Sequence, residues 1–120
     1  MFVKKLVNCN QFTANDSCKI RELLHPKNDP VELPYSIALA TVEQNQRSTP
    51  HKLEQDEVYY ILQGFGHMHI DDETSIVKTG DIIFIPAFSV QWIENNADID
   101  LNFLAIVSPP WTAEGDVRIV

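Results

Sequence analysis

Short runs of alternating apolar and polar residues dominate this chain. Segments rich in Val, Ile, Phe and Tyr recur between clusters of Gly, Pro, Asn and Asp, and no apolar repeat of helical period persists for three turns. This pattern predicts an all-β protein. The predicted strands are residues 2–7, 35–42, 57–63, 67–71, 75–78, 82–85, 90–94 and 101–107.

The segment 18–24 fits two kinds of element. Three of its apolar residues would share one face of a single helical turn, whereas Cys18, Ile20 and Leu24 also alternate with basic neighbours. We favour a strand here because the alternation accounts for more of the segment.

Turns and one loop separate the predicted strands. Residues 25–34 include three prolines, which cannot donate to a sheet ladder, and they predict an irregular surface loop. The segments 64–66 (Gly-Phe-Gly) and 71–72 (Asp-Asp) are typical of hairpin turns between neighbouring antiparallel strands. Residues 108–120 begin with two prolines after Ser108 and then become polar, so we expect this tail to pack outside the sheets.

The length and charge restrict the class of protein. A chain of 120 residues fits one domain, residues 1–120, with an N-terminal strand segment (1–34) and a C-terminal tail (108–120). Nine Lys and Arg residues against 17 Asp and Glu residues give a net charge of −8, which argues against nucleic acid as a partner.

The sequence also predicts a cytoplasmic protein with no membrane partner. No segment approaches the ~20 consecutive apolar residues that span a bilayer. Asn8, Asn10 and Gln11 interrupt the first apolar run before a signal-peptide core could form. Cys9 and Cys18 are the only cysteines, and we expect both to be free thiols.

Two stretches of the chain, residues 51–64 and 80–95, resemble the paired motifs of the cupin superfamily. Six residues stand at the spacing of the two motifs: His51, Glu57 and Gly64, then Gly80, Pro86 and Asn95. Leu53 and Gln91 stand where the motifs have histidines. The resemblance implies the cupin double-stranded β-helix, a small jelly roll with the site in its narrow interior.

The resemblance further implies a metal site. It makes His51, Glu57 and Gln91 the ligands of a divalent ion, with Leu53 lining the pocket without binding. Mn, Fe(II), Ni and Zn are all compatible with these ligand types. In the alternative, the same side chains form a metal-free hydrogen-bonded pocket in which protonated His51 compensates Glu57.

Tyr59 and Phe88 are further candidates near this site. Tyr59 follows Glu57 by two residues and so shares its face of the strand, which would let a phenol beside a metal ion act as a catalytic base. In this respect it is similar to some cupin lyases, although we favour a core tyrosine whose hydroxyl is hydrogen-bonded by a neighbour. Phe88 stands where the cupin motif has glycine, and we expect it to narrow the pocket.

The remaining histidines and aromatic residues receive structural interpretations. Alternation with Met68 sends His67 and His69 to the face opposite the core. His25 precedes a proline in the irregular loop, where we expect it to be solvated. We expect the larger aromatic side chains to fill the core or line the cavity: Phe84, Phe88, Trp92 and Phe103.

These observations predict a small cupin that binds a divalent metal and a small polar molecule, with lyase or isomerase chemistry as the favoured activity. A non-catalytic small-molecule-binding or regulatory cupin is the alternative, because this fold does not determine function. We also expect a homodimer formed through Trp111 and the segment 2–7.

Overall fold

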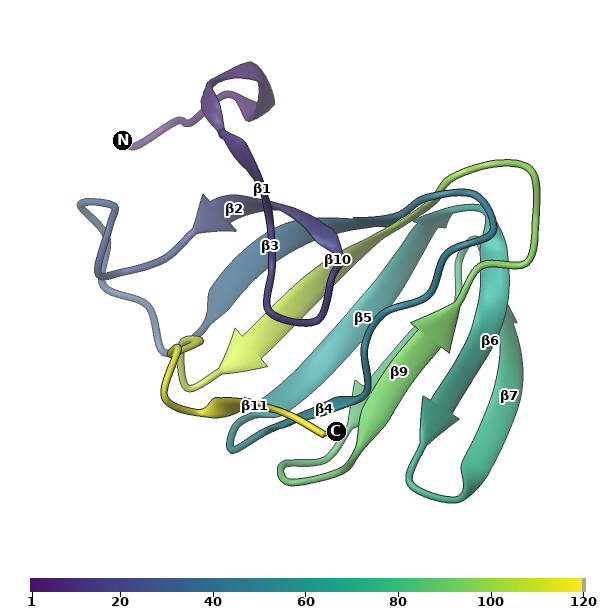
Figure 1. The fold of residues 1–120 in the computed structure, drawn as a ribbon. Helices are drawn as coiled ribbons and strands as arrows, with labels where there is room; N and C mark the ends of the chain where they lie inside the picture. The colour runs from purple at the N-terminus through teal and green to yellow at the C-terminus, as the bar shows by residue number, and fades with distance from the viewer. Residues whose placement is uncertain (120) are drawn as a thin grey trace.

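The computed structural model describes residues 1–119, which form two antiparallel β-sheets that face each other (Figure 1). The six-stranded sheet runs in the order β1 (Gln11–Thr13), β2 (Lys19–Leu24), β3 (Ser36–Val42), β10 (Leu101–Ser108), β5 (Asp56–Gln63) and β8 (Ile82–Ile85). The five-stranded sheet runs in the order β11 (Asp116–Arg118), β4 (His51–Leu53), β9 (Gln91–Glu94), β6 (Phe65–Ile70) and β7 (Glu73–Lys78). This architecture confirms the predicted all-β cupin jelly roll.

Alternation along the strands decides which side chains enter the space between the sheets. On β10, Leu101, Phe103, Ala105 and Val107 are buried, and the residues between them are less so. The end of the barrel around Phe103 is filled by large apolar side chains. At the other end Ala105 is paired with Ala38 across β10 and β3, so two methyl groups stand where larger side chains would close the interior.

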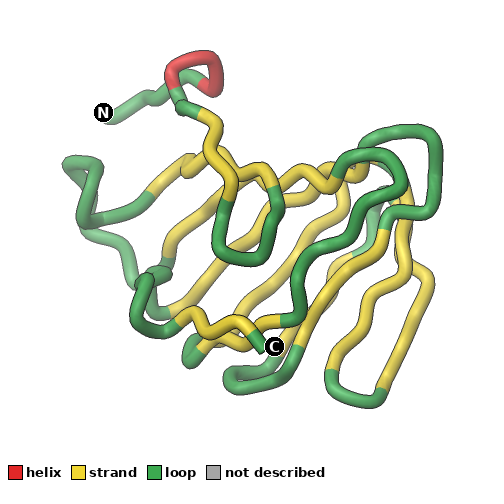
Figure 2. Tube along the Cα trace, viewed as in Figure 1, coloured by secondary structure: helices red, strands yellow, loops and turns green. Residues whose placement is uncertain are grey.

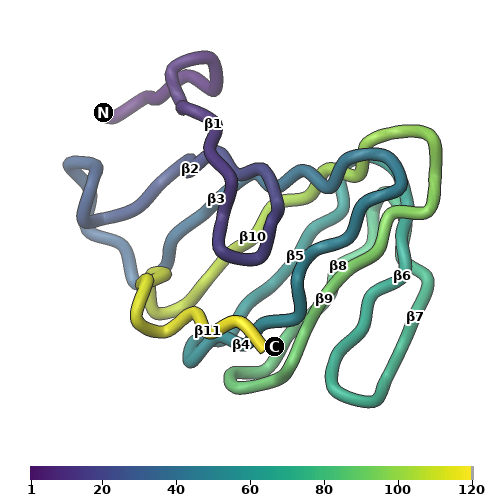
Figure 3. Tube along the Cα trace, in the orientation of Figure 1, coloured from purple at the N-terminus to yellow at the C-terminus, as the bar shows by residue number. Residues whose placement is uncertain are grey.

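The β1–β2 hairpin and the C-terminal segment meet at this less filled end of the barrel. Figure 3 shows the N-terminal hairpin β1–β2 (purple) and the C-terminal segment (yellow) on the same side of the sheets. The Asn15 side-chain amide donates to the Asp116 carbonyl, and the Thr49 backbone N–H donates to the Asp16 carbonyl. The hairpin turn and β11 therefore form a cap over the barrel, which we call the terminal cap (residues 9–24 and 108–119).

Two strand predictions need correction. Residues 2–7 do not form a strand; the only helical element in the described part of the chain, one 3₁₀ turn at Leu6–Asn8, lies here (Figure 2). The C-terminal tail does enter a sheet, because β11 pairs with β4. Each of β1, β4 and β11 has three residues, too few for alternation to be recognised in the sequence.

The predicted turns have different outcomes. The Asp71–Asp72 turn joins the paired strands β6 and β7, as predicted, and Asp71 has a positive φ of 52°. Gly64 also has a positive φ, but it joins β5 and β6, which belong to different sheets. That prediction of a hairpin was wrong because a turn residue identifies a change of direction and not the partner of the next strand.

Several other expectations can be checked directly. Cys9 and Cys18 are free and buried, as predicted. No helix within residues 1–119 has the length and apolar character needed to cross a membrane. Among the aromatic residues, Phe103 is in the core, whereas Phe84 and Phe88 are 59% and 68% exposed. Phe84 faces outward from β8 and Phe88 lies in a loop. The prediction that they fill the core or line the cavity was wrong because it was based only on side-chain size.

Candidate functional site

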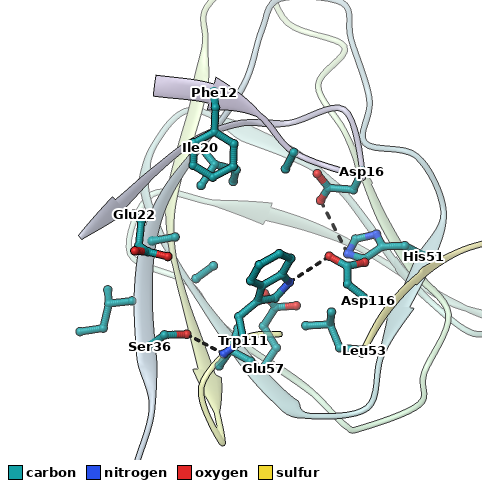
Figure 4. A pocket seen from close by; sticks show the side chains of 15 residues that line it. Phe12, Asp16, Ile20, Glu22, Ser36, His51, Leu53, Glu57, Trp111 and Asp116 are labelled. Carbon is teal, nitrogen blue, oxygen red and sulfur yellow. Dashed lines mark hydrogen bonds and ion pairs between the residues drawn. The ribbon is translucent and has the colours of Figure 1, made fainter. Parts of the chain in front are cut away.

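A cavity of about 100 Å³ occupies the less filled end of the barrel, under the terminal cap. Figure 4 shows the side chains that surround it. The walls are apolar, with Ile20, Leu53 and Val107 among the lining residues. The polar lining consists of a serine, a histidine and four carboxyl groups: Ser36, His51, Asp16, Glu22, Glu57 and Asp116. The cavity thus combines an acidic interior with hydrocarbon walls.

The three side chains predicted as metal ligands come from facing sheets. His51 on β4 pairs with Gln91 on β9, and Glu57 lies on β5 of the opposite sheet. Gln91 donates its amide N–H to Glu57 Oε1 over 2.9 Å, and its Oε1 accepts the Tyr59 hydroxyl over 2.9 Å. Gln91 therefore links Glu57 and Tyr59 in a buried chain of hydrogen bonds, while His51 and Glu57 line the cavity.

Glu57 is buried in a way that favours its neutral form. Burial raises the pKa of this carboxyl from 4.5 to about 8, the hydrogen bond from Gln91 opposes the rise, and the negative charges of Asp16 and Asp116 add to it. A protonated carboxyl can donate a hydrogen bond into the cavity as well as accept one.

Tyr59 is held in the core. Its ring packs against Phe103 with a centroid separation of 4.2 Å, its hydroxyl is bonded to Gln91, and it is not among the residues that line the cavity. Burial, with the charge of Glu57 adding to it, raises the pKa of Tyr59 well above its usual 10. This environment gives no support to a role as catalytic base and supports a role in orienting Gln91.

His51 has one nitrogen fixed and one directed to the cavity. Nδ1 lies 3.0 Å from the Thr49 carbonyl oxygen, which can only accept, so Nδ1 carries a proton. Nε2 lies 3.6 Å from Asp16 Oδ2, farther than a hydrogen bond, and both side chains are almost entirely buried. Asp16 is held by its other oxygen, which accepts the Cys18 backbone N–H.

The C-terminal segment contributes Trp111 and Asp116. The indole N–H of Trp111 donates to Asp116 Oδ2 over 3.0 Å, whereas Asp116 Oδ1 is buried without a hydrogen-bond partner (Figure 4). The Trp111 backbone is fixed at both of its polar groups: Ser36 Oγ accepts its N–H and His25 Nε2 donates to its carbonyl. Trp111 is thus held as part of the cavity wall and not presented on the surface as expected.

His25 is buried, contrary to the expectation of a solvated loop residue. Its Nδ1 accepts the Lys27 backbone N–H, which leaves Nε2 as the donor to Trp111. The loop 25–34 is irregular as predicted, but its first residue anchors the terminal cap. Nothing in the local sequence indicates this, because the partner lies 86 positions away.

Two other predictions concern residues around the cavity. Leu53 lines it, next in alternation to His51. Phe88 does not narrow it: the side chain points to solvent, and Phe88 adopts a positive φ of 67° at the position where the cupin motif has glycine. His67 and His69 lie on the outer face, where His69 stacks on Trp92 at 4.3 Å.

Sequence analysis missed Asp16 and Asp116. They lie in the terminal cap, outside both motifs, and each comes from a turn or a three-residue strand. No spacing rule connects residues 100 positions apart, so only the fold brings them together around His51.

The side chains present do not form a cupin metal centre of the usual kind. Leu53 has no ligand atom, and Gln91, whose oxygen accepts the Tyr59 hydroxyl, is not among the residues that line the cavity. Across residues 1–119, no three His, Cys, Asp or Glu side chains are positioned to hold a metal ion together. The arrangement fits a polar binding pocket better than a divalent-ion site.

The chain belongs to the cupin family, since the cupin-domain family model matches residues 38–107. It is 38% identical over 104 residues to an uncharacterized protein, MJ1618, of Methanocaldococcus jannaschii, which covers 86% of this chain and 82% of that one. An oxalate-binding protein of Thermotoga maritima is 40% identical over 58 residues, or 48% of each chain.

A solved structure shares the fold over almost the whole chain. The plu4264 protein of Photorhabdus luminescens superposes with a TM-score of 0.79 at 25% identity, covering 96% of this chain and 91% of that one. The family model matches residues 38–107, and Asp16, Trp111 and Asp116 lie outside them. Much of the polar cavity lining is therefore contributed by segments that the family model does not match.

Proposed function

We propose that this protein binds a small molecule in the cavity between its sheets, without a resident metal ion. The observation that carries the proposal is the engagement of Gln91 at both ends of its carboxamide, by Glu57 and by Tyr59. A carboxamide held in this way is directed to protein partners at both ends, and Gln91 is not among the residues that line the cavity. The hydrocarbon walls and few convergent polar groups are typical of small-molecule sites.

A metal-dependent lyase or isomerase is the second candidate. It is favoured by His51, whose Nδ1 donates to a backbone carbonyl while Nε2 faces the cavity, as in many metal-binding histidines. The candidate ions are those compatible with imidazole and carboxylate ligands: Mn, Fe, Ni or Zn.

Elemental analysis of the purified protein separates the two candidates. Under the proposed function, metal is well below one ion per chain and is unchanged in the His51→Ala and Glu57→Ala variants. One ion per chain, lost in both variants and retained in the outer-face control His67→Ala, would establish the second candidate and refute the first.

Occupancy of the cavity is tested by filling it. The Ala105→Leu variant places a larger side chain on the cavity wall, and it should abolish the thermal shift that a screened small-molecule ligand produces. Ala113→Leu, at an exposed position of the terminal cap, is the matched control. A ligand that stabilises Ala105→Leu as much as the parent protein would show that it binds elsewhere.

The oxalate-binding relative raises the question of an anionic ligand. Oxalate carries two carboxylates, and without a metal ion it would need cationic partners. The cavity lining includes no Lys or Arg, and four of its residues are acidic. Binding of oxalate by this metal-free pocket is therefore not part of the proposal.

We further propose that the protein forms a homodimer through the outer face of the six-stranded sheet. Eight apolar residues lie on this face of β3, β10, β5 and β8, and all except Leu62 are joined to another of them by strand pairing: Leu39, Leu104, Ile106, Val58, Tyr60, Leu62, Ile82 and Phe84. Ile82 is 73% exposed, and none of the eight is charged. A second copy can cover such a patch with the same surface about a two-fold axis.

Light scattering tests the dimer and its location. Replacing Ile82 by Lys should convert a dimer into a monomer, because the charge would be buried in the apolar interface. Ile76→Lys, at an exposed isoleucine on β7 of the other sheet, should leave the dimer intact. A monomeric parent protein would refute the proposal, and a monomer produced only by the Ile76 variant would place the interface elsewhere.

A further inference from the structure

The polar end of the cavity holds hydrogen-bond acceptors that have no donors. Asp116 Oδ1 is buried without a partner, although Oδ2 of the same carboxyl accepts the Trp111 indole N–H. A buried oxygen that has lost its hydrogen bonds to water lowers the stability of the folded protein unless another group donates a hydrogen bond to it. The Trp111 bond fixes the carboxyl, so Oδ1 cannot turn to solvent without breaking an existing contact.

A second polar pair faces the same space. Asp16 is 8% exposed and His51 3% exposed, and Oδ2 and Nε2 of these residues are 3.6 Å apart. Because Nδ1 donates to the Thr49 carbonyl, Nε2 is the His51 nitrogen directed toward the Asp16 carboxylate. Figure 4 shows Asp16 and Asp116 approaching His51 from the two terminal segments. A donor group placed among them would satisfy the free oxygens of the two carboxyl groups.

Among residues 1–119, no cationic donor lies on the protein side of this cavity. No Lys or Arg is among its lining residues, and the Trp111 indole N–H is already engaged by Asp116. A ligand that brings several N–H bonds and a positive charge therefore complements the site, whereas a carboxylate would face other carboxyl groups.

The apolar walls of the cavity indicate that the rest of such a ligand is a hydrocarbon group. Ile20 and Phe12 come from the β1–β2 hairpin, and Val107 and Ala105 from β10. These side chains offer hydrocarbon contacts and no polar atoms. A volume of about 100 Å³ suits a molecule of about four or five non-hydrogen atoms, since a cavity of about 150 Å³ holds benzene, which has six.

We propose that the cavity recognises a small aliphatic amine, with its ammonium group between Asp16, His51 and Asp116 and its hydrocarbon chain against the apolar walls. This inference rests on the proposed small-molecule function and names its ligand class. It is independent of any activity on the bound amine.

Calorimetry on the full-length, chelator-treated protein tests the ligand class with three probes of similar shape: n-butylamine, n-butanol and butyrate. Butylamine should bind at least tenfold more tightly than either of the others. Equal binding of the three, or tighter binding of butyrate, would overturn the amine class and leave small-molecule binding standing. No binding of any probe, together with no stabilising ligand in a broad screen, would refute the proposed function as well.

Two conservative variants test the residues. Asp16→Asn and Asp116→Asn can still accept the Cys18 and Trp111 N–H groups, so both should fold, while each loses the charge that faces the ligand. Each should weaken butylamine binding at least tenfold. Asp72→Asn, in the exposed β6–β7 turn, is the matched control and should bind like the parent protein. Unchanged binding in both folded cavity variants would overturn the assignment.

Discussion

The barrel segment, residues 38–107, and the terminal cap, residues 9–24 and 108–119, contribute to the cavity in different ways. The barrel supplies the apolar core and the side chains at cupin motif positions, among them His51 and Glu57. The cap supplies Asp16, Trp111 and Asp116, which lie beyond the residues matched by the family model. The comparison indicates that the barrel encloses the cavity and that the cap supplies many of the polar groups that would select a ligand.

The two regions also differ in how they are held. Large side chains with almost no exposed surface fill the barrel around Phe103. The cap is held at its edges by the β2–β3 and β11–β4 ladders, and over the cavity by single contacts at long sequence separation, such as His25 with Trp111 and Asn15 with Asp116. Apolar burial contributes more to the free energy of unfolding than a few hydrogen bonds do, so mutations should affect the two regions unequally.

The largest effect is expected in the barrel core. Phe103→Ala should lower the free energy of unfolding by about 3–5 kcal/mol, because it leaves a cavity between the sheets and removes the ring that packs against Tyr59. Phe12→Ala, at a half-exposed position of the cap, is the comparison and should cost about 1 kcal/mol. Both values are measured by urea unfolding. Equal costs would contradict the contrast between barrel and cap.

The next effect is the pH dependence that Glu57 imposes. The unfolded chain releases this proton near pH 4.5, whereas the folded protein retains it to about pH 8. Between these values the unfolded state binds fewer protons, so the contribution of Glu57 to stability falls as pH rises, by roughly a few kcal/mol over the whole window. Below pH 4.5 this penalty is absent.

Thermal unfolding of the Glu57→Gln variant isolates that contribution from the other carboxyl groups. The parent protein should lose stability relative to the variant as pH increases from 4.5 to 8, and the difference should level off above pH 8. A difference that does not change with pH would show that Glu57 is ionised in the folded protein throughout this range.

A smaller and more local effect is expected at His25. His25→Ala removes the donor to the Trp111 carbonyl and should lower the free energy of unfolding by about 1–2 kcal/mol. Hydrogen exchange should become faster for the amides of residues 111–119 and remain unchanged for β10. Faster exchange throughout β10 would mean that the cap and the barrel open as one unit.

The smallest effect is expected at Phe88. Phe88→Gly relieves a positive φ of 67° at an exposed position, so it should stabilise the protein by about 1 kcal/mol or less. Ligand binding should not change, because the side chain lies outside the cavity. A broader range of ligands in this variant would restore the idea that Phe88 narrows the pocket.

Alternation and motif spacing were enough to predict the all-β class and most of the longer strands. They also predicted that Glu57 and Tyr59 share one face of their strand, and both are buried on the inner face of β5. These features depend on neighbours a few residues apart, and that is the range over which strand geometry repeats. The His-to-Leu and His-to-Gln departures at positions 53 and 91 could likewise be read from the sequence alone.

Only the tertiary structure decided what surrounds the motif residues. The approach of Asp16 and Asp116 to His51, the burial of His25, and the use of the Gln91 oxygen by Tyr59 all join segments that no local pattern connects. Such contacts follow from sheet register and from the way the chain ends fold back over the barrel. The sequence by itself determined the strands and the barrel that they form. The packing of distant segments decided which charges and hydrogen-bond acceptors face the interior of the barrel.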